Sequence, residues 1–258
     1  MQKPFFSIVI PTLNEAKFLP RLLDDLTAQI WPDFEVIVVD AGSDDGTADE
    51  AEKFAGRLKL TIIQSKKRGV SIQRNLGGDR ARADWVIFMD ADNRIDAGFF
   101  LTLRLKLAKM EDSKHRFDFF STLAKLNPRD QKIAKHRVAI NTTNMANIAM
   151  EHTKSPNILG ALIGVRRSWF DQIKFNPAVK FGEDMRFGQD LIAAGAKFKL
   201  LRQPRFCYDM RRWDDKNLLE STKIVLGGQV VSHSRRDEFD EYPMDGGEMY
   251  QKSDDSHN

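Results

Sequence analysis

The chain has 258 residues, of which 41% are hydrophobic and 30% charged, a composition typical of a globular protein with a substantial core. Its net charge of +3 is a small difference between 40 basic and 37 acidic residues, so the charge gives no support for a nucleic-acid partner. Cys207 is the only cysteine, which excludes an intrachain disulfide and favours a reducing compartment. The sequence shows no signal peptide and no apolar run near the ~18 residues of a membrane span. We therefore expect a cytoplasmic protein without a transmembrane segment, with peripheral contact at the inner face of a membrane left open.

Apolar runs and helical spacings alternate from the N-terminus to residue 92. Each short apolar run suits a strand buried on both faces, and each is followed by a polar loop and a stretch of helical character. Thr47 and Glu50 have the spacing of a capping box, so a helix is expected to open at Thr47. This alternation predicts an α/β fold with a mostly parallel central sheet. The predicted strands are 5–10, 34–39, 60–63 and 85–89, and the helices between them are 18–26, one from 47, and 69–83.

The alternating pattern becomes less regular after Asp92. Residues 124–156 are the least readable, with some helical character, and 158–165 suit a strand or loop whose glycines allow another group to come close. From residue 234 the chain is polar and charged, which predicts a disordered tail at 234–258. The remaining expected elements are helices at 99–110, from 168, from 181–184 and at 218–231, and strands at 117–122 and 197–201.

Acidic and polar residues follow the predicted strands where those strands end. The carboxyl ends of parallel strands meet at one edge of a sheet, and ligands bind in the crevice beyond it. Crowded carboxylates are costly unless a cation or hydrogen-bond donors offset them. A nucleotide offers donors, and a metal diphosphate would suit an acidic pair. The residues gathered at this edge are Thr12, Asn14, Glu15, Asp40, Asp44, Asp90 and Asp92.

Simpler explanations exist for two of these acidic segments. Asp90-Ala91-Asp92 suits a strand-to-loop turn in which aspartates cap backbone amides. Glu183-Asp184 would place favourable negative charge at a helix N-terminus. The order of the motifs along the chain favours the functional interpretation of both.

The ordered set of motifs resembles that of the family 2 glycosyltransferases over residues 5 to 195. Each motif is weakly specific alone, whereas the ordered set is specific. Residues 7–15 look like the opening strand and loop of the family, 38–47 its second signature, 69–75 the helix before the metal site, 90–92 its Asp-x-Asp motif, and 182–184 the segment that supplies the catalytic base.

The resemblance implies a GT-A fold, a Rossmann-like arrangement of three layers around one mixed, mostly parallel sheet. It implies a single domain over residues 1–233, with a nucleotide-binding half at about 1–98 and an acceptor-binding half at about 99–233. The implied reaction is an inverting transfer, without a covalent intermediate, from a nucleotide-diphosphate sugar, most often a UDP-sugar. The implied cofactor is Mg²⁺ or Mn²⁺, and the acceptor would be a glycan, a lipid-linked molecule or a small molecule.

The resemblance also implies roles for particular residues. Asp184 would be the general base, since a carboxylate within hydrogen-bond reach can accept the proton of an acceptor hydroxyl. Glu183 would orient its neighbours, and Arg74 would lie near the diphosphate or brace the acidic loops. Asp92 would bind the metal directly, with Asp90 toward the ribose or the metal. Contacts to the base are implied for Pro11, Thr12, Glu15 and Asp40, and a contact to the ribose for Asp44.

Some features depart from the family or support alternatives. Arg212-Trp213 is similar to the end of the Gln-x-x-Arg-Trp motif of processive members, but position 209 is Asp, which argues against a synthase of secreted polymers. His233 is a weaker candidate for a further metal ligand, because a lone histidine lacks supporting ligand spacing. One alternative is a sugar-phosphate nucleotidyltransferase, which would need a Gly-rich basic loop where this chain has 11–15. Another is a binding module that holds the nucleotide sugar without turnover.

Overall fold

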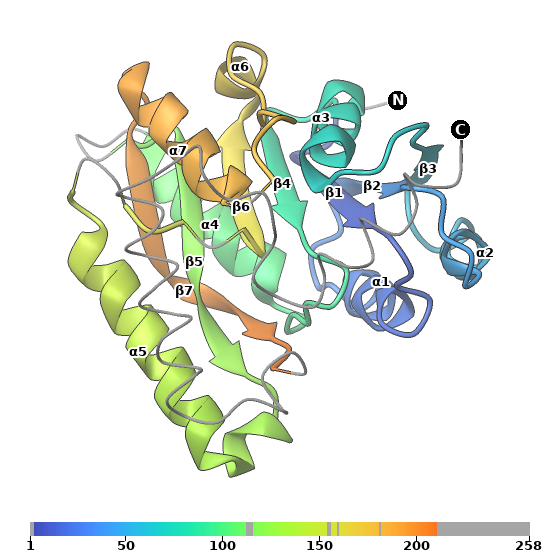
Figure 1. Ribbon diagram of the computed structural model, residues 1–258, viewed down its shortest axis with the longest axis horizontal. Helices are drawn as coiled ribbons and strands as arrows, with labels where there is room; N and C mark the ends of the chain where they lie inside the picture. Colours follow the sequence, from blue (N-terminus) through green and yellow to red (C-terminus); the bar gives the residue numbers. More distant parts are fainter. Residues whose placement is uncertain (1–2, 112–115, 154–155, 159, 181, 211–258) are drawn as a thin grey trace.

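A computed structural model of the chain describes residues 3–111, 116–153, 156–158, 160–180 and 182–210. It contains one seven-stranded sheet with helices on both faces (Figure 1). No helix in these described residues is both long and apolar enough to cross a bilayer. The elements in chain order are β1 (Phe6–Thr12), α1 (Leu19–Thr27), β2 (Phe34–Asp40), α2 (Thr47–Glu52), β3 (Leu60–Gln64), α3 (Val70–Arg80), β4 (Trp85–Met89), α4 (Phe99–Glu111), β5 (Phe119–Leu126), a 3-10 turn η1 (Asp130–Lys132), α5 (Ala134–Met150), β6 (Leu162–Arg166), α6 (Arg167–Phe170), α7 (Glu183–Ala193) and β7 (Phe198–Tyr208).

The strand order is β3-β2-β1-β4-β6-β5-β7. All neighbours pair in parallel except β6, which is antiparallel to both β4 and β5. The predicted α/β fold with a mostly parallel sheet is therefore confirmed. The chain turns back on itself at β1, which lies between β2 and β4, and a crevice is expected beyond the carboxyl ends of strands at such a reversal.

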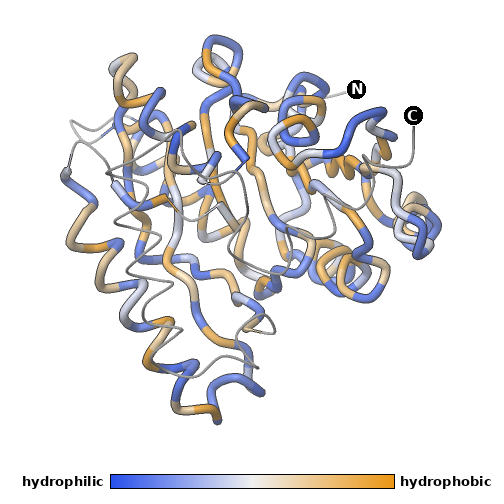
Figure 2. Tube along the Cα trace, viewed as in Figure 1, coloured by the Kyte–Doolittle hydropathy of each residue, from blue (hydrophilic) through white to orange (hydrophobic). Residues whose placement is uncertain are grey.

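The strands are apolar on both sides because each side packs against helices. Ile8 and Ile10 of β1 belong to the core under α1, α2 and α4, whereas Val9 between them belongs to the core under α3, α6 and α7. Figure 2 shows the hydrophobic colours gathered on the central strands and alternating colours along α5. This two-sided burial explains why unbroken apolar runs, and not alternating ones, mark the strands in the sequence.

Helix α3 lies unusually close to the sheet. A Cβ atom at Gly77 would lie 2.3 Å from a Val9 methyl group, and one at Gly78 would lie 2.3 Å from the Phe170 ring. Any larger residue would push the helix away, because real Cβ atoms do not make such contacts. The two glycines thus allow α3 to bring its N-terminal half over the ends of β1, β2 and β4.

The start of α2 differs from the predicted capping box. The helix begins at Thr47 as expected, but Gly46 precedes it in the left-handed region with φ 86°. The backbone amide and the hydroxyl of Thr47 both donate to the Asp45 carboxylate, and the hydroxyl also accepts from the amide of Glu15 at 2.8 Å. The capping prediction was wrong because Thr47 is used to hold the loop after β1.

The second half of the chain is more regular than its sequence indicates. Residues 124–156 contain the end of β5 and the whole of α5, which lies beside β5 (Figure 1). β7 continues to Tyr208, well past the predicted end at 201. The expected helix at 218–231, the Arg211-Arg212-Trp213 segment, His233 and the tail lie outside the described residues, so the predicted boundary at 233 stays a prediction.

Candidate active site

The ends of β1 and β2 hold a buried carboxylate. Asp40 is 1% exposed, and its carboxylate accepts hydrogen bonds from the amides of Gly42 (3.2 Å) and Ser43 (3.0 Å) and from the Ser43 hydroxyl. The Thr12 hydroxyl donates to the same carboxylate at 3.2 Å. This network fixes the ends of both strands and holds Asp40 in one orientation.

The loops after β1 and β2 are joined to each other. The Asn14 amide donates to the Ser43 hydroxyl (2.9 Å), and the Asn14 side-chain oxygen accepts from the amide of Asp44 (3.1 Å). Asn14 has φ 55°, a left-handed conformation that asparagine tolerates better than most residues. Asp44 itself is exposed at this junction. The two loops therefore form one rigid rim at the carboxyl edge of the sheet.

Arg74 of α3 is the centre of a second polar cluster. Its side chain is 3% exposed, and its guanidinium donates to Glu183 Oε1 (2.8 Å), Asp90 Oδ1 (3.2 Å) and the Gly160 carbonyl (3.1 Å). Burial alone would lower the pKa of Arg74, but the charges of Glu183, Asp90 and Asp184 raise it above its ordinary value. A permanently charged guanidinium thus joins the loop after β4 to the start of α7.

Asp184 lies in the first turn of α7, immediately after Glu183. Loss of hydration and the neighbouring charge of Glu183 raise the pKa of Asp184 to about 7, against the opposing effects of Arg74 and of the amides of Met185 and Gly160. A Cβ atom at Gly160 would lie 2.5 Å from Asp184 Oδ2, so only glycine leaves room for this carboxylate. A carboxyl group that titrates near neutral pH can accept a proton in a reaction near that pH.

The two clusters are connected through consecutive residues of α3. The Gln73 side chain, fully buried, donates to the carbonyls of Thr12 and Val39, both at 2.8 Å. Arg74, the next residue, reaches Asp90 and Glu183. The structure therefore brings the ends of β1, β2 and β4 and the start of α7 to one side of one helix.

The predicted site residues occupy different depths at this edge. Pro11 and Thr12 are buried at the end of β1, and Asp40 is buried at the end of β2. Glu15, Asp90 and Asp92 are partly exposed. Hydrogen bonds join Thr12 to Asp40, Asn14 to Asp44 and Arg74 to Asp90.

The metal implied by the resemblance can be tested against these side chains. No group of three or more His, Cys, Asp and Glu residues is placed to hold an ion among the residues that the structure describes. Asp90 uses one oxygen on Arg74 while its side chain is 37% exposed, and Asp92 lies two residues further on. Mg²⁺ commonly binds one or two carboxylates and completes its shell with substrate phosphates and water. Asp90 and Asp92 fit a site of that kind, completed by a diphosphate.

Sequence reasoning assigned no role to three residues that shape the site. Gln73, Asn75 and Gly160 are not acidic and do not follow a strand of the parallel set. Asn75 makes two hydrogen bonds with the backbone of Phe175, at 2.8 and 3.0 Å, and the Phe175 ring lies 5.2 Å from the Arg74 guanidinium. For Gly160 the available signal was the pair of glycines in the 158–165 stretch, which predicted a close approach by another group without naming that group.

Comparisons with known proteins agree with this geometry. The model of "Glycosyl transferase family 2" matches residues 7–174, more than half of the chain. A "PGL/p-HBAD biosynthesis glycosyltransferase" of Mycobacterium bovis is 43% identical over 97 residues, 37% of this chain and 38% of that protein. The "Poly(ribitol-phosphate) beta-N-acetylglucosaminyltransferase TarS" of Staphylococcus aureus is 35% identical over 95 residues, 35% of this chain and 17% of that one. The match thus spans well under half the length of these relatives.

Two solved structures show the same fold at low sequence identity. TarS residues 1–349 with UDP superpose with a TM-score of 0.62 at 22% identity, covering 90% of this chain and 73% of that one. The mannosyltransferase PcManGT of Pyrobaculum calidifontis with GDP-Man and Mn²⁺ gives 0.66 at 19% identity, covering 92% and 72%. The predicted GT-A fold is confirmed by this likeness and by the sheet topology. The ordered motifs, the GT-A architecture and the match to the family model lead to one conclusion: the chain belongs to family 2 of the glycosyltransferases, a family of enzymes.

Proposed function

We propose that the protein transfers a sugar, with inversion, from a nucleotide-diphosphate donor to an acceptor hydroxyl. The observation that carries the proposal is the buried Arg74, which bonds Asp90 on one side and Glu183, next to Asp184, on the other. This contact supports a role for Asp90 on the donor side and for Asp184 on the acceptor side of one site. The reaction class is supported by the family and by the raised pKa of Asp184, about 7.

In the proposed step Asp184 accepts the proton of the acceptor hydroxyl. The hydroxyl oxygen forms its bond to the anomeric carbon as the bond from that carbon to the diphosphate oxygen breaks, and the nucleoside diphosphate leaves with the electron pair. Arg74 holds Glu183, the residue before Asp184, and Gly160 leaves room for the Asp184 carboxylate. Asp92, with Asp90, would hold Mg²⁺ or Mn²⁺, which when bound offsets the charge that grows on a departing diphosphate.

The nucleotide is assigned to the rim formed by the loops after β1 and β2. Pro11, Thr12, Glu15 and Asp40 would contact the base, and the exposed Asp44 the ribose. The neighbours bind UDP in one structure and GDP-Man in another, which supports a nucleotide sugar in general. We favour UDP, with residues 1–98 as the donor half and residues 99–233 as the acceptor half.

We expect Asp92→Ala to weaken UDP binding only when metal is present. The residue would supply a direct metal ligand, so its loss removes the link between protein and diphosphate. Isothermal titration of UDP with Mn²⁺ and with EDTA measures this, and we expect at least a tenfold rise in Kd with Mn²⁺ and little change with EDTA. Asp49→Ala, an exposed aspartate on α2, is the matched control. Equal UDP affinity with and without metal in the unaltered protein would contradict the assignment.

We expect Gly160→Ala to impair turnover more than donor binding. The added methyl group would lie 2.5 Å from Asp184 Oδ2 and must move the proposed base. A displacement of about 1 Å at a reacting group can lower the rate by roughly a hundredfold. Steady-state kinetics should show a fall in kcat of at least about tenfold with little change in donor Kd. Gly56→Ala, where a Cβ meets nothing within 4 Å, is the control; a normal kcat in the Gly160 variant would exclude this crowding.

The function as a whole is tested with a panel of nucleotide sugars and Mn²⁺. Release of nucleoside diphosphate from one donor, accelerated by an acceptor, is the expected result. Release of pyrophosphate from a sugar phosphate and a nucleoside triphosphate would indicate a nucleotidyltransferase. Binding of a donor without any release would indicate a module that does not turn over.

A further inference from the structure

The outward face of α4 is apolar at its centre and basic at its margins. The inward side buries Phe99, Phe100, Leu103 and Leu107 against the sheet. Opposite them Leu105 is 57% exposed, and Leu101 and Ala108 on the same side are partly or fully exposed. We call this outward surface the α4 face; it consists of Leu101, Leu105 and Ala108 with the cations Arg104, Lys106 and Lys109.

The charge on the α4 face is of one sign. Glu111 is the only acidic residue in α4, and it forms an ion pair with Arg166 at 3.0 Å. Asp96, just before the helix, is paired with Lys125. The Arg104 guanidinium is held 5.1 Å from the Trp31 ring and 5.3 Å from the Phe5 ring, so it is positioned at the margin of the face.

The apolar part of the surface continues beyond the helix. Ile30 is 68% exposed, and its amide donates to the Ala97 carbonyl at 2.9 Å, so it lies beside the start of α4. Ile30 and Leu105 are among the most exposed aliphatic side chains in the described residues. Leu105 lies on α4 and Ile30 lies beside the start of α4.

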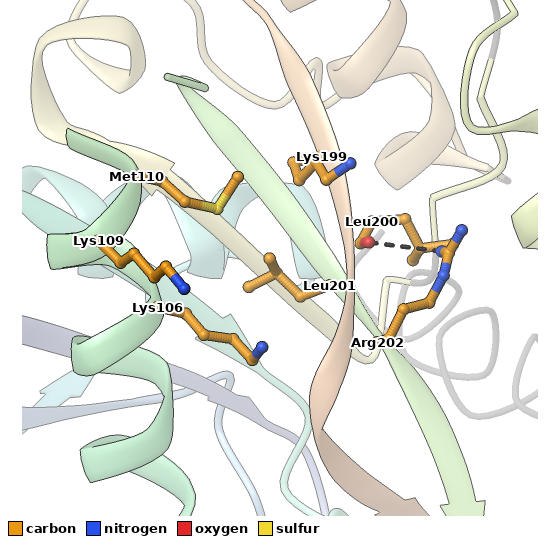
Figure 3. A pocket seen from close by; sticks show the side chains of 7 residues that line it. All are labelled: Lys106, Lys109, Met110, Lys199, Leu200, Leu201 and Arg202. Carbon is orange, nitrogen blue, oxygen red and sulfur yellow. Dashed lines mark hydrogen bonds between the residues drawn. The ribbon is translucent and has the colours of Figure 1, made fainter. Parts of the chain in front are cut away.

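A pocket lined by four cationic and three apolar side chains adjoins the α4 face on the side of β7. It has a volume of about 430 Å³. Figure 3 shows Lys106, Lys109 and Met110 extending from α4 toward Leu201 on β7. Lys199 and Arg202 share the buried Glu151, at 3.0 and 2.8 Å, so one carboxylate offsets part of their charge. The lining residues are Lys106, Lys109, Met110, Lys199, Leu200, Leu201 and Arg202.

We propose that the α4 face docks on an anionic lipid bilayer, with lipid phosphates beside Lys106 and Lys109 at the mouth of the pocket. A surface helix with a central apolar stripe and basic margins is suited to the headgroup region, where apolar side chains enter the acyl boundary and cations meet lipid phosphates. A second copy of this chain fits less well, because a two-fold contact would place the same cations against one another. The sheet edge with Asp90 and Asp184 is not part of this face, so the proposal stands independently of the proposed function.

The test is flotation of the full chain with vesicles of phosphatidylcholine alone or with phosphatidylglycerol added. We expect binding to the anionic vesicles, weakened by salt, and little binding to the neutral ones. Each cation near an anionic surface strengthens binding by roughly fivefold, so Lys106→Glu with Lys109→Glu should lower partitioning by at least about 25-fold. Leu105→Gln should lower it by a few fold. Lys53→Glu with Lys59→Glu, which reverses two exposed lysines at α2 and β3, should leave partitioning unchanged.

Three results would overturn the proposal. They are no binding to anionic vesicles, equal binding of the Lys106/Lys109 variant and its control, or a dimer in light scattering that the Leu105 variant disrupts. Each substituted side chain on α4 reaches solvent, so the variants should fold, and thermal unfolding by circular dichroism checks that they do. Lys106→Gln with Lys109→Gln provides a milder pair, for which an intermediate loss is expected.

Discussion

Asp184→Asn should lower sugar transfer by about 10²–10⁴-fold, the range that a positioned general base supplies. The substitution keeps the size of the side chain and one acceptor oxygen, but removes its ability to accept a proton. Donor binding should persist, because the contacts of Asp184 are with the backbone of Met185 in α7 and of Gly160, and the nucleotide is assigned to the loops after β1 and β2. Turnover and donor titration on the same preparation separate the two effects.

The pH dependence follows from the same carboxylate. The base acts only when ionised, and burial raises its pKa to about 7, so kcat/KM should rise as pH rises through about 7 and level off above it. The rising limb should vanish in the Asp184→Asn variant. Asp190→Asn on the same helix, where the carboxylate only pairs with Arg186 at the surface, is the matched control and should keep both rate and limb. A normal kcat/KM in the Asp184→Asn variant would show that Asp184 is not the general base.

Arg74→Met should destabilise the protein by about 3–5 kcal/mol, because it leaves the partner carboxylates without their buried cation. Glu183 is 13% exposed in its side chain and has its short contact with Arg74 at 2.8 Å. Urea unfolding measures the loss. Arg80→Met, an exposed residue at the end of the same helix, should stay within about 0.5 kcal/mol of the unaltered protein.

Two further variants separate charge from geometry at this position. Arg74→Lys keeps the charge but not the planar fork, so it should restore part of the stability and less of the activity. Adding Glu183→Gln to Arg74→Met removes one of the stranded charges, so the double variant should be more stable than the sum of the single losses. Strict additivity would mean that the two side chains are not coupled.

The sequence was most informative where burial was complete and apolar. β1, β2 and β4 were predicted because helices cover both of their faces, which leaves unbroken apolar runs such as Trp85 to Met89. α5 was not readable because three of its five buried positions are polar. The Asn144 side chain pairs with the backbone of Ala124, at 2.9 and 3.2 Å, and does so in place of an apolar contact. His136 and Asn147 are likewise buried, so no apolar periodicity marks this helix.

The shared edge of the candidate residues was predictable, but their contacts were not. Asp40, Asp90 and Asp92 were expected at one edge, since the carboxyl ends of parallel strands share an edge. Arg74 was expected to lie near the diphosphate or to brace the acidic loops. Its contacts with Glu183 and the Gly160 carbonyl were not predicted, because they depend on β6, which enters antiparallel beside β4 and brings the Ala161 carbonyl to the Asp90 amide at 3.1 Å. The hydrophobic pattern of a single strand does not reveal whether the strand pairs in parallel or antiparallel.

The contact of α3 with the sheet has a consequence for how such a protein can diversify. Gly77 and Gly78 leave no space for a side chain between the helix and Val9 or Phe170, so a larger residue at either position would displace the helix. Gln73 and Arg74 therefore keep their positions relative to the strand ends. The distance between the proposed nucleotide site and the proposed general base, Asp184, would then be inherited as a unit. New acceptor preferences should then arise from changes in segments that do not pack on α3, such as α5, while Gln73 and Arg74 stay constant.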